Sequence, residues 1–280
     1  MTAGWQWDET LFAGTAAFYR RGRLPYAPGT AEVIVNVLTA GRTSRLLDVG
    51  CGPGTIGVSL APFFGEVVGI DPDPGMIAEA ELWADGAGLA DRTRWLRMRA
   101  EDLPAGLGRF DVVTFGQSFH WMDRDIVPAA VHAMLRPGGA LVHIAEWRNE
   151  LRTVEGLPHP AAPAVAIEKL VRQYLGPLRR AGQGTLPHGT PGDEVAVLAR
   201  AGFEGPDQHI VRGGQQLVRT EDDIVAWTFS LSSAAPHLFG EQRDAFEAEL
   251  RRLLREESPS GLFSERQPST EVRIWYTEED

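Results

Sequence analysis

The residues best suited to binding chemistry gather in one short stretch, residues 46–57, which reads LLDVGCGPGTIG. In it, Asp48 precedes three closely spaced glycines, Gly50, Gly52 and Gly54. Because glycine has no Cβ, such a turn can adopt positive φ and bring main-chain N–H groups close to a bound molecule. The apolar residues before the turn predict a buried parallel strand, and the residues after it predict a helix whose N-terminus faces the same molecule. This stretch therefore predicts a ligand site at the end of a strand.

The same turn also contains the pattern G-x-G-x-x-G. Gly52, Gly54 and Gly57 fit this pattern, and Asp71 follows about twenty residues after the first of them, as dinucleotide-binding folds require. An NAD-dependent oxidoreductase is therefore one interpretation. It leaves the acid at Asp48 and the additional glycine at Gly50 unexplained.

A second stretch with chemical potential is GQSFHWMD, residues 116–123. His120 could take a proton from a hydroxyl, an amine or an activated carbon, because the pKa of histidine lies near neutrality. Phe119 and Trp121 offer aromatic faces, which are suitable neighbours for a cation. The alternative is that His120 and Trp121 pack at a helix start and make a backbone hydrogen bond, and both interpretations stay open.

Alternating strands and helices must position these residues. The apolar runs predict strands at 46–49, 67–70, 94–99, 110–115 and 140–146, and the alternation of strands and helices through residue 147 is typical of a doubly wound α/β sheet. Asp71 then lies at the carboxyl edge of the sheet, where open α/β folds bind ligands. Further on, we expect a strand over 208–218 that is bulged at Gly213 and Gly214, and a last strand over 272–276. Thr30 and Thr220 are predicted helix N-caps.

Five segments together resemble the class I S-adenosyl-L-methionine (SAM) dependent methyltransferases, most closely the small-molecule branch known as methyltransferase type 11. They cover residues 40–147 in the order and spacing of that family and read RLLDVGCGPG, VVGIDPDPGM, RAEDLP, FDVVTFGQSFHWMD and LRPGGALV. The resemblance implies an α/β, Rossmann-like doubly wound sheet of seven strands, with the last strand antiparallel between the fifth and the sixth. It also implies SAM as cofactor and S-adenosyl-L-homocysteine (SAH) as product.

The resemblance assigns roles to individual residues. Asp48 would help to anchor the methionine amino group, Asp71 would accept the ribose hydroxyls, and Met76 could lie against the adenine face. An acid at Glu101 or Asp102 would accept the exocyclic amino hydrogens of adenine. The full set expected around the cofactor is Asp48, Gly50, Cys51, Gly52, Gly54, Asp71, Pro72, Met76, Glu101, Asp102, Leu103, Gln117 and Phe119.

We expect four segments in the chain. These are a lid over 1–29, a SAM-binding core over 30–147, a cap insertion over 148–191, and a C-terminal part of the core over 192–280 with the last two strands and helices. An N-terminal helix that serves only stability is the alternative to the lid, and a disordered surface excursion is the alternative to the cap. Aromatic side chains would form the wall that receives the acceptor, namely Trp5, Trp7, Tyr19, Tyr26 and Trp121. The candidate catalytic residues are His120 and Tyr26.

Composition excludes several classes of partner. The net charge of −11 would repel a phosphate backbone, so no nucleic-acid partner is expected, and the arginines at positions 20, 21 and 23 are explained by a solvated helix face. A single cysteine, Cys51, rules out an internal disulfide and a cysteine-based zinc site. No metal is predicted. The absence of a long apolar run and of a signal-like N-terminus predicts a cytoplasmic protein without a membrane partner.

The function that the resemblance implies is transfer of the sulfonium methyl to an O, C or N nucleophile of a small molecule by in-line displacement. The 8 tryptophans favour an aromatic or apolar acceptor, such as a natural-product intermediate. Two alternatives stay open: a SAM-binding protein of this fold that catalyses a non-methylating reaction or acts as a binding module, and the NAD-dependent oxidoreductase.

Overall fold

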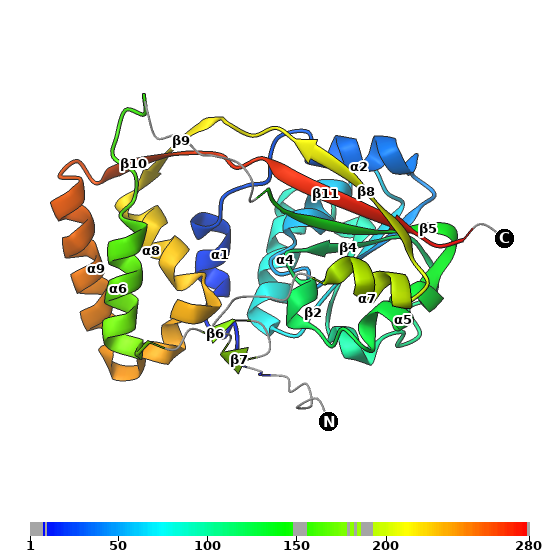
Figure 1. The fold of residues 1–280 in the computed structure, drawn as a ribbon, viewed down its shortest axis with the longest axis horizontal. Helices are drawn as coiled ribbons and strands as arrows, with labels where there is room; N and C mark the ends of the chain where they lie inside the picture. The colour runs from blue at the N-terminus through cyan, green and yellow to red at the C-terminus, as the bar shows by residue number, and fades with distance from the viewer. Residues whose placement is uncertain are drawn as a thin grey trace.

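The computed structural model describes residues 8, 10–147, 156–177, 180–181, 184–185 and 193–278. Its centre is a sheet of seven strands in the order β3-β2-β1-β4-β5-β11-β8 (Figure 1). The first five run parallel: β1 Arg45–Val49, β2 Glu66–Asp71, β3 Thr93–Arg97, β4 Phe110–Gly116 and β5 Leu135–Glu146. Strand β11, Thr270–Tyr276, lies antiparallel between β5 and β8, Glu204–Val211. The predicted sheet and its antiparallel last strand are therefore confirmed.

Helices cover both faces of this sheet. On one face, α2 (Thr30–Leu38) and α3 (Thr55–Leu60) bury Ile34 and Leu60 against the strands, and α4 (Pro74–Gly86) packs beside them over β2 and β3. On the other face, α5 (Val127–Met134) and α7 (Glu194–Arg200) bury Val131 and Leu198. Strands β1, β2 and β4 are buried on both sides, which explains why they read as nearly continuous apolar runs. The edge strand β3 is more exposed and combines polar with apolar residues.

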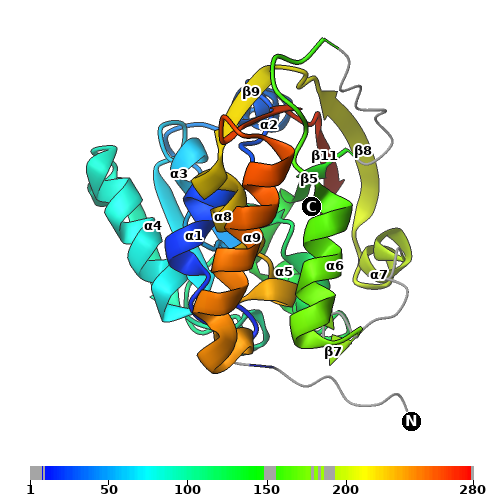
Figure 2. The same cartoon turned by 90° about the vertical axis from the view of Figure 1, so that its left-hand side faces the viewer.

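A second, mainly helical lobe stands beside the sheet (Figures 1 and 2). It contains α6 (Ala164–Leu175), α8 (Glu221–Phe229), α9 (Arg243–Glu257) and the hairpin of β9 (Gln216–Thr220) with β10 (Leu262–Arg266). Its own apolar core includes Phe229, Phe239 and Phe246. The rings of Phe239 and Phe246 stack with 4.0 Å between their centroids. Helix α1, Ala16–Gly22, packs on α8. We refer to these elements without α1 as the helical lobe.

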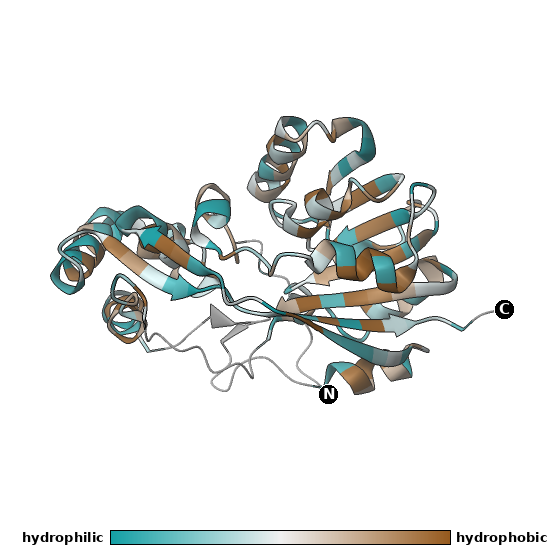
Figure 3. Cartoon of the chain, turned by 90° about the horizontal axis from the view of Figure 1, so that it is seen from above, coloured by the Kyte–Doolittle hydropathy of each residue, from teal (hydrophilic) through white to brown (hydrophobic). Residues whose placement is uncertain are grey.

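The helical lobe differs from the predicted division of the chain, in which all of 192–280 completes the sheet core. Only α7, β8 and β11 do so, whereas residues 216–266 join α6 in the helical lobe. Seen from above, a group of helices with two short strands stands apart from the large sheet (Figure 3). Likewise, the single strand expected over 208–218 is two strands in two different sheets, β8 and β9. The break occurs where Gly213 passes so close to Pro268 that a Cβ would lie 2.3 Å from its carbonyl oxygen.

Two predicted N-caps have different outcomes. Thr220 forms a complete capping box with Asp223 at the start of α8, as expected. Thr30 is instead the first residue of α2, Gly29 holds the cap position with φ +86°, and the Thr30 hydroxyl donates to the Ala27 carbonyl at 2.7 Å.

The remaining elements are short. Two-residue strands pair as β6 (Arg180–Ala181) and β7 (Gly184–Thr185), and the 3-10 turns are η1 Ala90–Arg92, η2 Ala100–Asp102, η3 Phe119–Trp121, η4 Ser232–Ala234 and η5 Pro236–Gln242. Within the described ranges, no helix is long and apolar enough to cross a membrane.

Candidate functional site

The glycine turn after β1 has the conformation that its sequence predicts. Gly50, Gly52 and Gly54 have φ values of +66°, +53° and +83°. A Cβ on Gly50 would lie 2.6 Å from the Ser118 Cβ, whereas a Cβ on Gly52 would meet no atom within 4 Å. Gly50 is thus required for close packing of the turn on the loop after β4. Gly52 leaves an open backbone surface that a ligand can approach.

Gly57, the third glycine of the dinucleotide pattern, is explained by packing. A Cβ there would lie 2.8 Å from the ring of Trp95 and 3.2 Å from Asp48 Oδ2. Trp95 is buried across this point and also across Gly69, where a Cβ would lie 2.2 Å from the ring. The glycines at 57 and 69 therefore make room for one indole.

Asp48 is buried under the turn with 1% exposure. Its Oδ2 accepts the Gly57 N–H at 3.0 Å and its Oδ1 accepts the Thr114 hydroxyl at 2.8 Å. Burial raises the pKa of Asp48 to about 6, against the lowering effect of these two hydrogen bonds. A carboxylate at the start of α3 would repel a pyrophosphate, so this turn suits a ligand without phosphates.

Asp71 stands at the carboxyl end of β2 and links the two ligand-facing loops. Its Oδ2 accepts the Gly52 N–H at 3.0 Å, and its Oδ1 accepts the Asp73 N–H at 2.9 Å. Burial raises the pKa of Asp71 to about 7. Each carboxylate oxygen can accept more than one hydrogen bond, so Asp71 keeps acceptor capacity toward the pocket.

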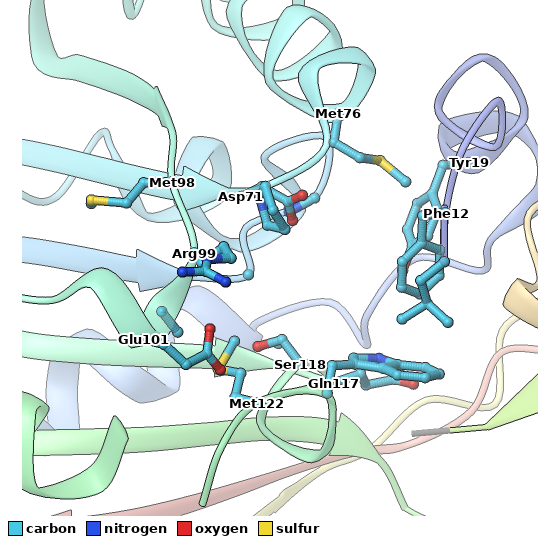
Figure 4. Close-up of a pocket in the computed structure, with 17 residues that line it drawn as sticks. Phe12, Tyr19, Asp71, Met76, Met98, Arg99, Glu101, Gln117, Ser118 and Met122 are labelled. Carbon is cyan, nitrogen blue, oxygen red and sulfur yellow. The ribbon is translucent and has the colours of Figure 1, made fainter. Parts of the chain in front are cut away.

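One pocket, which we call the main pocket, lies at these strand ends (Figure 4). Phe12 and Tyr19 lie across it from Arg99 and Glu101 (Figure 4). Its lining residues come from the N-terminal segment and from the ends of β1, β2, β3 and β4, and they are Leu11, Phe12, Tyr19, Gly50, Gly52, Asp71, Pro72, Met76, Met98, Arg99, Ala100, Glu101, Gly116, Gln117, Ser118, Trp121 and Met122.

The N-terminal segment closes one side of the main pocket. The ring of Phe12 meets the ring of Trp121 edge-on, with 5.3 Å between centroids. Leu11 is buried beside them with 5% exposure. Aromatic and aliphatic walls of this kind exclude water and bind apolar or flat ligand groups.

Polar side chains hold the opposite wall. Glu101 Oε1 accepts the Asp123 N–H at 2.8 Å, which ties η2 to the loop after β4. Arg99 forms an ion pair with Asp102 at 2.9 Å on the outer side. The Ser118 hydroxyl donates to the Val49 carbonyl at 2.6 Å. These contacts fix the loops after β1, β3 and β4 relative to one another.

A second, polar pocket adjoins the main pocket, and we call it the polar pocket. The two share Tyr19, Gly50, Gly52, Gly116 and Gln117, so they form one continuous site. The polar pocket is further lined by Arg23, Leu24, Tyr26, Asp48, Cys51, Pro53, Thr55, Ile56 and Glu146.

Two residues of the polar pocket have unusual states. Burial raises the pKa of the Tyr26 hydroxyl above its usual range, so this group stays protonated near neutral pH and acts as a donor. Gln117 has φ +55°, a conformation that residues with a side chain rarely adopt, and its N–H donates to the Ile144 carbonyl at 3.0 Å. Such backbone conformations cluster at ligand sites.

The structure brings most of the predicted cofactor and acceptor residues to the two pockets, but not all of them. Gly54 and Leu103 pack inside, Asp102 faces an outer groove with Arg99, and Phe119 is buried against Phe115 and His143. His120 stacks near Trp121, at 4.7 Å between ring centroids, and lines neither pocket. Trp5 and Trp7 lie outside the described residues.

Several lining residues did not follow from the sequence. In the main pocket they are Leu11, Phe12, Met98, Arg99, Ala100, Gly116, Ser118 and Met122, and in the polar pocket Arg23, Leu24, Pro53, Thr55, Ile56 and Glu146. Phe12 could have been found from its helical spacing to Tyr19, and Glu146 from its place at a strand end. Arg23 carries no such signal. In the described part of the chain, no group of three or more His, Cys, Asp or Glu side chains could hold a metal ion.

Sequence comparisons agree with this geometry. A sequence model of the methyltransferase domain family matches residues 46–139. A ubiquinone biosynthesis O-methyltransferase of Cereibacter sphaeroides is 39% identical over 192 residues, which cover 67% of this chain and 68% of that protein. The chain belongs to the class I SAM-dependent methyltransferases. The cofactor of this family is SAM.

Other methyltransferases match less of their length. An uncharacterized methyltransferase of Mycobacterium tuberculosis is 33% identical over 144 residues, 51% of this chain and 55% of that protein. The chain thus spans about half the length of this curated relative. Among solved structures, the YcgJ protein from Bacillus subtilis superposes with a TM-score of 0.52 at 15% identity, covering 89% of this chain and 98% of that one. This likeness shows the shared methyltransferase fold.

The residues present fit SAM. The cofactor has no phosphate, which agrees with the buried carboxylate of Asp48 below the turn. It offers a ribose diol, for which Asp71 keeps acceptor capacity, and an open backbone surface exists at Gly52. Its apolar adenine face requires soft, buried neighbours, and Met76 and Met122 line the main pocket with 2% and 7% exposure.

Proposed function

We propose that this protein transfers the methyl group of SAM to an O, C or N nucleophile of a small acceptor molecule. The observation that carries the proposal is the Asp71 carboxylate, which accepts the Gly52 N–H at 3.0 Å and lines the main pocket at the strand ends. SAM supplies an activated methyl on a sulfonium, so the protein needs chiefly to align the acceptor and exclude water.

The residues of the site divide this task. Asp71 would accept the ribose hydroxyls, Glu101 lies on the wall where an adenine amino group needs an acceptor, and Met76 offers a soft surface to the ring. Asp48 supports the glycine turn from below, through its hydrogen bond to Gly57, and contributes negative charge near the methionine end.

The acceptor would enter along the aromatic side of the main pocket. Phe12, Tyr19 and Trp121 lie there, and their apolar surfaces favour a flat or apolar acceptor. Holding acceptor and methyl donor in line can contribute roughly 7–11 kcal/mol to catalysis. The acidic net charge of −11 makes a polyanionic acceptor such as nucleic acid unfavourable. A cytoplasmic location belongs to the same proposal, because one cysteine suits a reducing compartment.

Two residues are candidates for removing a proton from the acceptor, Tyr26 and His120, and they differ in their position relative to the pockets. The Tyr26 hydroxyl stays protonated near neutral pH, so it would orient an acceptor as a donor. His120 stands one residue before Trp121, outside the lining of the pockets, and would act as a base only if the acceptor reaches past that indole. An acceptor that is already deprotonated needs neither group.

Thermal unfolding with added ligands tests the proposal. SAM, SAH and NAD are added separately at equal excess. A ligand at about a hundred times its Kd stabilises the protein by roughly 2.7 kcal/mol, which raises Tm by a few degrees. We expect SAM and SAH to raise Tm and NAD to leave it unchanged, and a rise with NAD alone would refute the cofactor.

Methyl transfer itself is tested by SAH release in the presence of a panel of phenols, catechols, enols and aromatic amines. We expect at least one of these classes to give SAH and a methylated product. SAH binding with no methylation of any class would favour the non-methylating alternative.

A further inference from the structure

Arg23 is a cation of the site that lies between the cofactor pockets and the helical lobe. It is the C-cap residue that follows α1, and it lines the polar pocket. Its Nη2 donates to the Ser230 carbonyl at 2.9 Å, at the end of α8, and its guanidinium lies 4.9 Å from the centroid of the Tyr19 ring. Its Nε is buried and has no hydrogen-bond partner among the described residues. Arg23 is therefore held in place and keeps an unused donor.

The charges around the two pockets single out this arginine. Among the described lining residues, the cations are Arg23 in the polar pocket and Arg99 in the main pocket. Arg99 lies on the wall with Glu101 and is already paired with Asp102 (Figure 4). The polar pocket also holds two carboxylates, Asp48 and Glu146. Arg23 is therefore the cationic side chain that an anionic ligand group would meet in this pocket.

The cofactor carries one anionic group, the carboxylate of its amino-acid end. Asp71 in the main pocket suits the ribose, which leaves the amino-acid end to extend into the adjoining polar pocket, where Gly50 and Gln117 line both spaces. A carboxylate accepts well from the planar guanidinium, and such charge-assisted hydrogen bonds are the strong ones. The ammonium group of the cofactor's amino-acid end is complementary in charge to the carboxylates of Asp48 and Glu146 in the polar pocket.

Arg23 also sits on a rigid connection to the helical lobe. At the neighbouring Gly22, a Cβ would lie 2.5 Å from backbone atoms of Ala226, so α1 and α8 touch backbone to backbone. The Gly22 carbonyl accepts from Arg219 Nη2 at 2.7 Å, and the ring of Phe18 lies 5.2 Å from that of Phe229. A ligand group bound by the Arg23 guanidinium would therefore share this side chain with the Ser230 carbonyl at the end of α8.

We propose that Arg23 couples cofactor binding to the helical lobe, because its guanidinium holds the Ser230 carbonyl and the carboxylate of the cofactor at the same time. Binding of the cofactor's amino-acid end then fixes the end of α8 and the following η4 turn. The aromatic wall on the N-terminal segment is fixed with them, so the acceptor side is completed only after the cofactor is bound. This inference rests on the proposed function of the site.

The first test compares two ligands that differ by one carboxylate. SAH and its decarboxylated analogue, S-adenosyl-3-thiopropylamine, are titrated into the full chain by calorimetry. We expect the wild type to bind SAH about ten- to a hundredfold more tightly. Arg23→Gln should remove this preference by weakening SAH alone, and Arg23→Lys should restore part of it.

Arg20→Gln is the matched control, because Arg20 is on the same helix, stacks on Trp83 at 4.4 Å and lines neither the main nor the polar pocket. It should leave both affinities unchanged. Equal binding of the two ligands by the wild type overturns the inference, as does an equal loss of both in Arg23→Gln. If the wild type binds neither ligand, the proposed cofactor itself is wrong, which is a distinguishable result.

The second test follows the coupling by hydrogen exchange at saturating ligand. We expect SAH to slow exchange of the amides of residues 230–234 in the wild type, where Leu231 donates to Thr228 and Ala234 donates to Leu231. The decarboxylated analogue should not slow it, nor should SAH in Arg23→Gln. Equal protection by both ligands would show that the lobe does not respond to the carboxylate.

Discussion

Replacing Asp71 with asparagine should remove most of the pH dependence of cofactor binding. The ribose hydroxyls donate to a carboxylate, so the binding form of Asp71 is the ionised one. Burial raises its pKa to about 7 in the free protein, so a large share of the molecules must lose a proton on binding at neutral pH. SAH affinity should therefore fall as the pH falls below about 7.

The size of this effect follows from the ionised fraction. With a pKa of about 7, that fraction is roughly nine-tenths near pH 8 and roughly one-tenth near pH 6, so affinity should fall about tenfold, or about 1.4 kcal/mol. Calorimetry between these pH values measures it, and buffers of different ionisation enthalpy report the released proton. Asp71→Asn keeps the shape of the side chain but presents an amide that cannot accept fully from both Gly52 and Asp73.

Weaker binding that is nearly independent of pH is thus expected for Asp71→Asn. Asp48, with a pKa of about 6, is present in both proteins, so the difference between their pH profiles isolates Asp71. Parallel pH profiles would refute the reasoning, as would wild-type affinity that rises on acidification. The same raised pKa means that the folded state binds this proton more tightly than the unfolded chain. Asp71 therefore lowers the free energy of unfolding as the pH rises from about 4 to about 7.

Three further predictions concern packing and catalysis. Gly57→Ala should lower the free energy of unfolding, measured by urea titration, by about 1–3 kcal/mol, because its Cβ would lie 2.8 Å from Trp95. Gly86→Ala is the control: a Cβ at Gly86 meets nothing within 4 Å, so this variant should be as stable as the wild type or more stable. Phe12→Ala should raise the KM for an aromatic acceptor by roughly two- to tenfold, because the contact of Phe12 with Trp121 is lost. Acceptor saturation curves measure this KM, and an unchanged value would contradict the prediction. His120→Ala should lower kcat at saturating acceptor only if His120 is the base. Wild-type turnover from about pH 6 to pH 9 would show that its role is structural.

Local sequence signals determined the sheet and its ligand edge. The apolar runs, the positive-φ glycines and the acids at Asp48 and Asp71 each follow from local chemistry, since a parallel strand, a tight turn and a strand-end carboxylate are specified by neighbouring residues. For this reason the positions of the first five strands along the chain and the place of the glycine turn could be predicted, whereas their order in the sheet came from the family resemblance. The cap expected after the fifth strand also has an ordered helix, α6.

Only the tertiary structure decided how distant segments complete the site. The helical lobe unites α6 with residues 216–266, because their apolar faces bury one another around Phe229 and Phe246. Neither segment carries a local sequence signal that identifies the other as its packing partner. Gly57 is likewise explained only by the fold, because the indole of Trp95 packs where its Cβ would be. The sequence alone assigns Arg23 to a solvated helix face, whereas the fold places it at the polar pocket. Short-range patterns fix the backbone because their partners are neighbours in the chain. Which side chains meet across long separations depends on packing that is complete only in the fold.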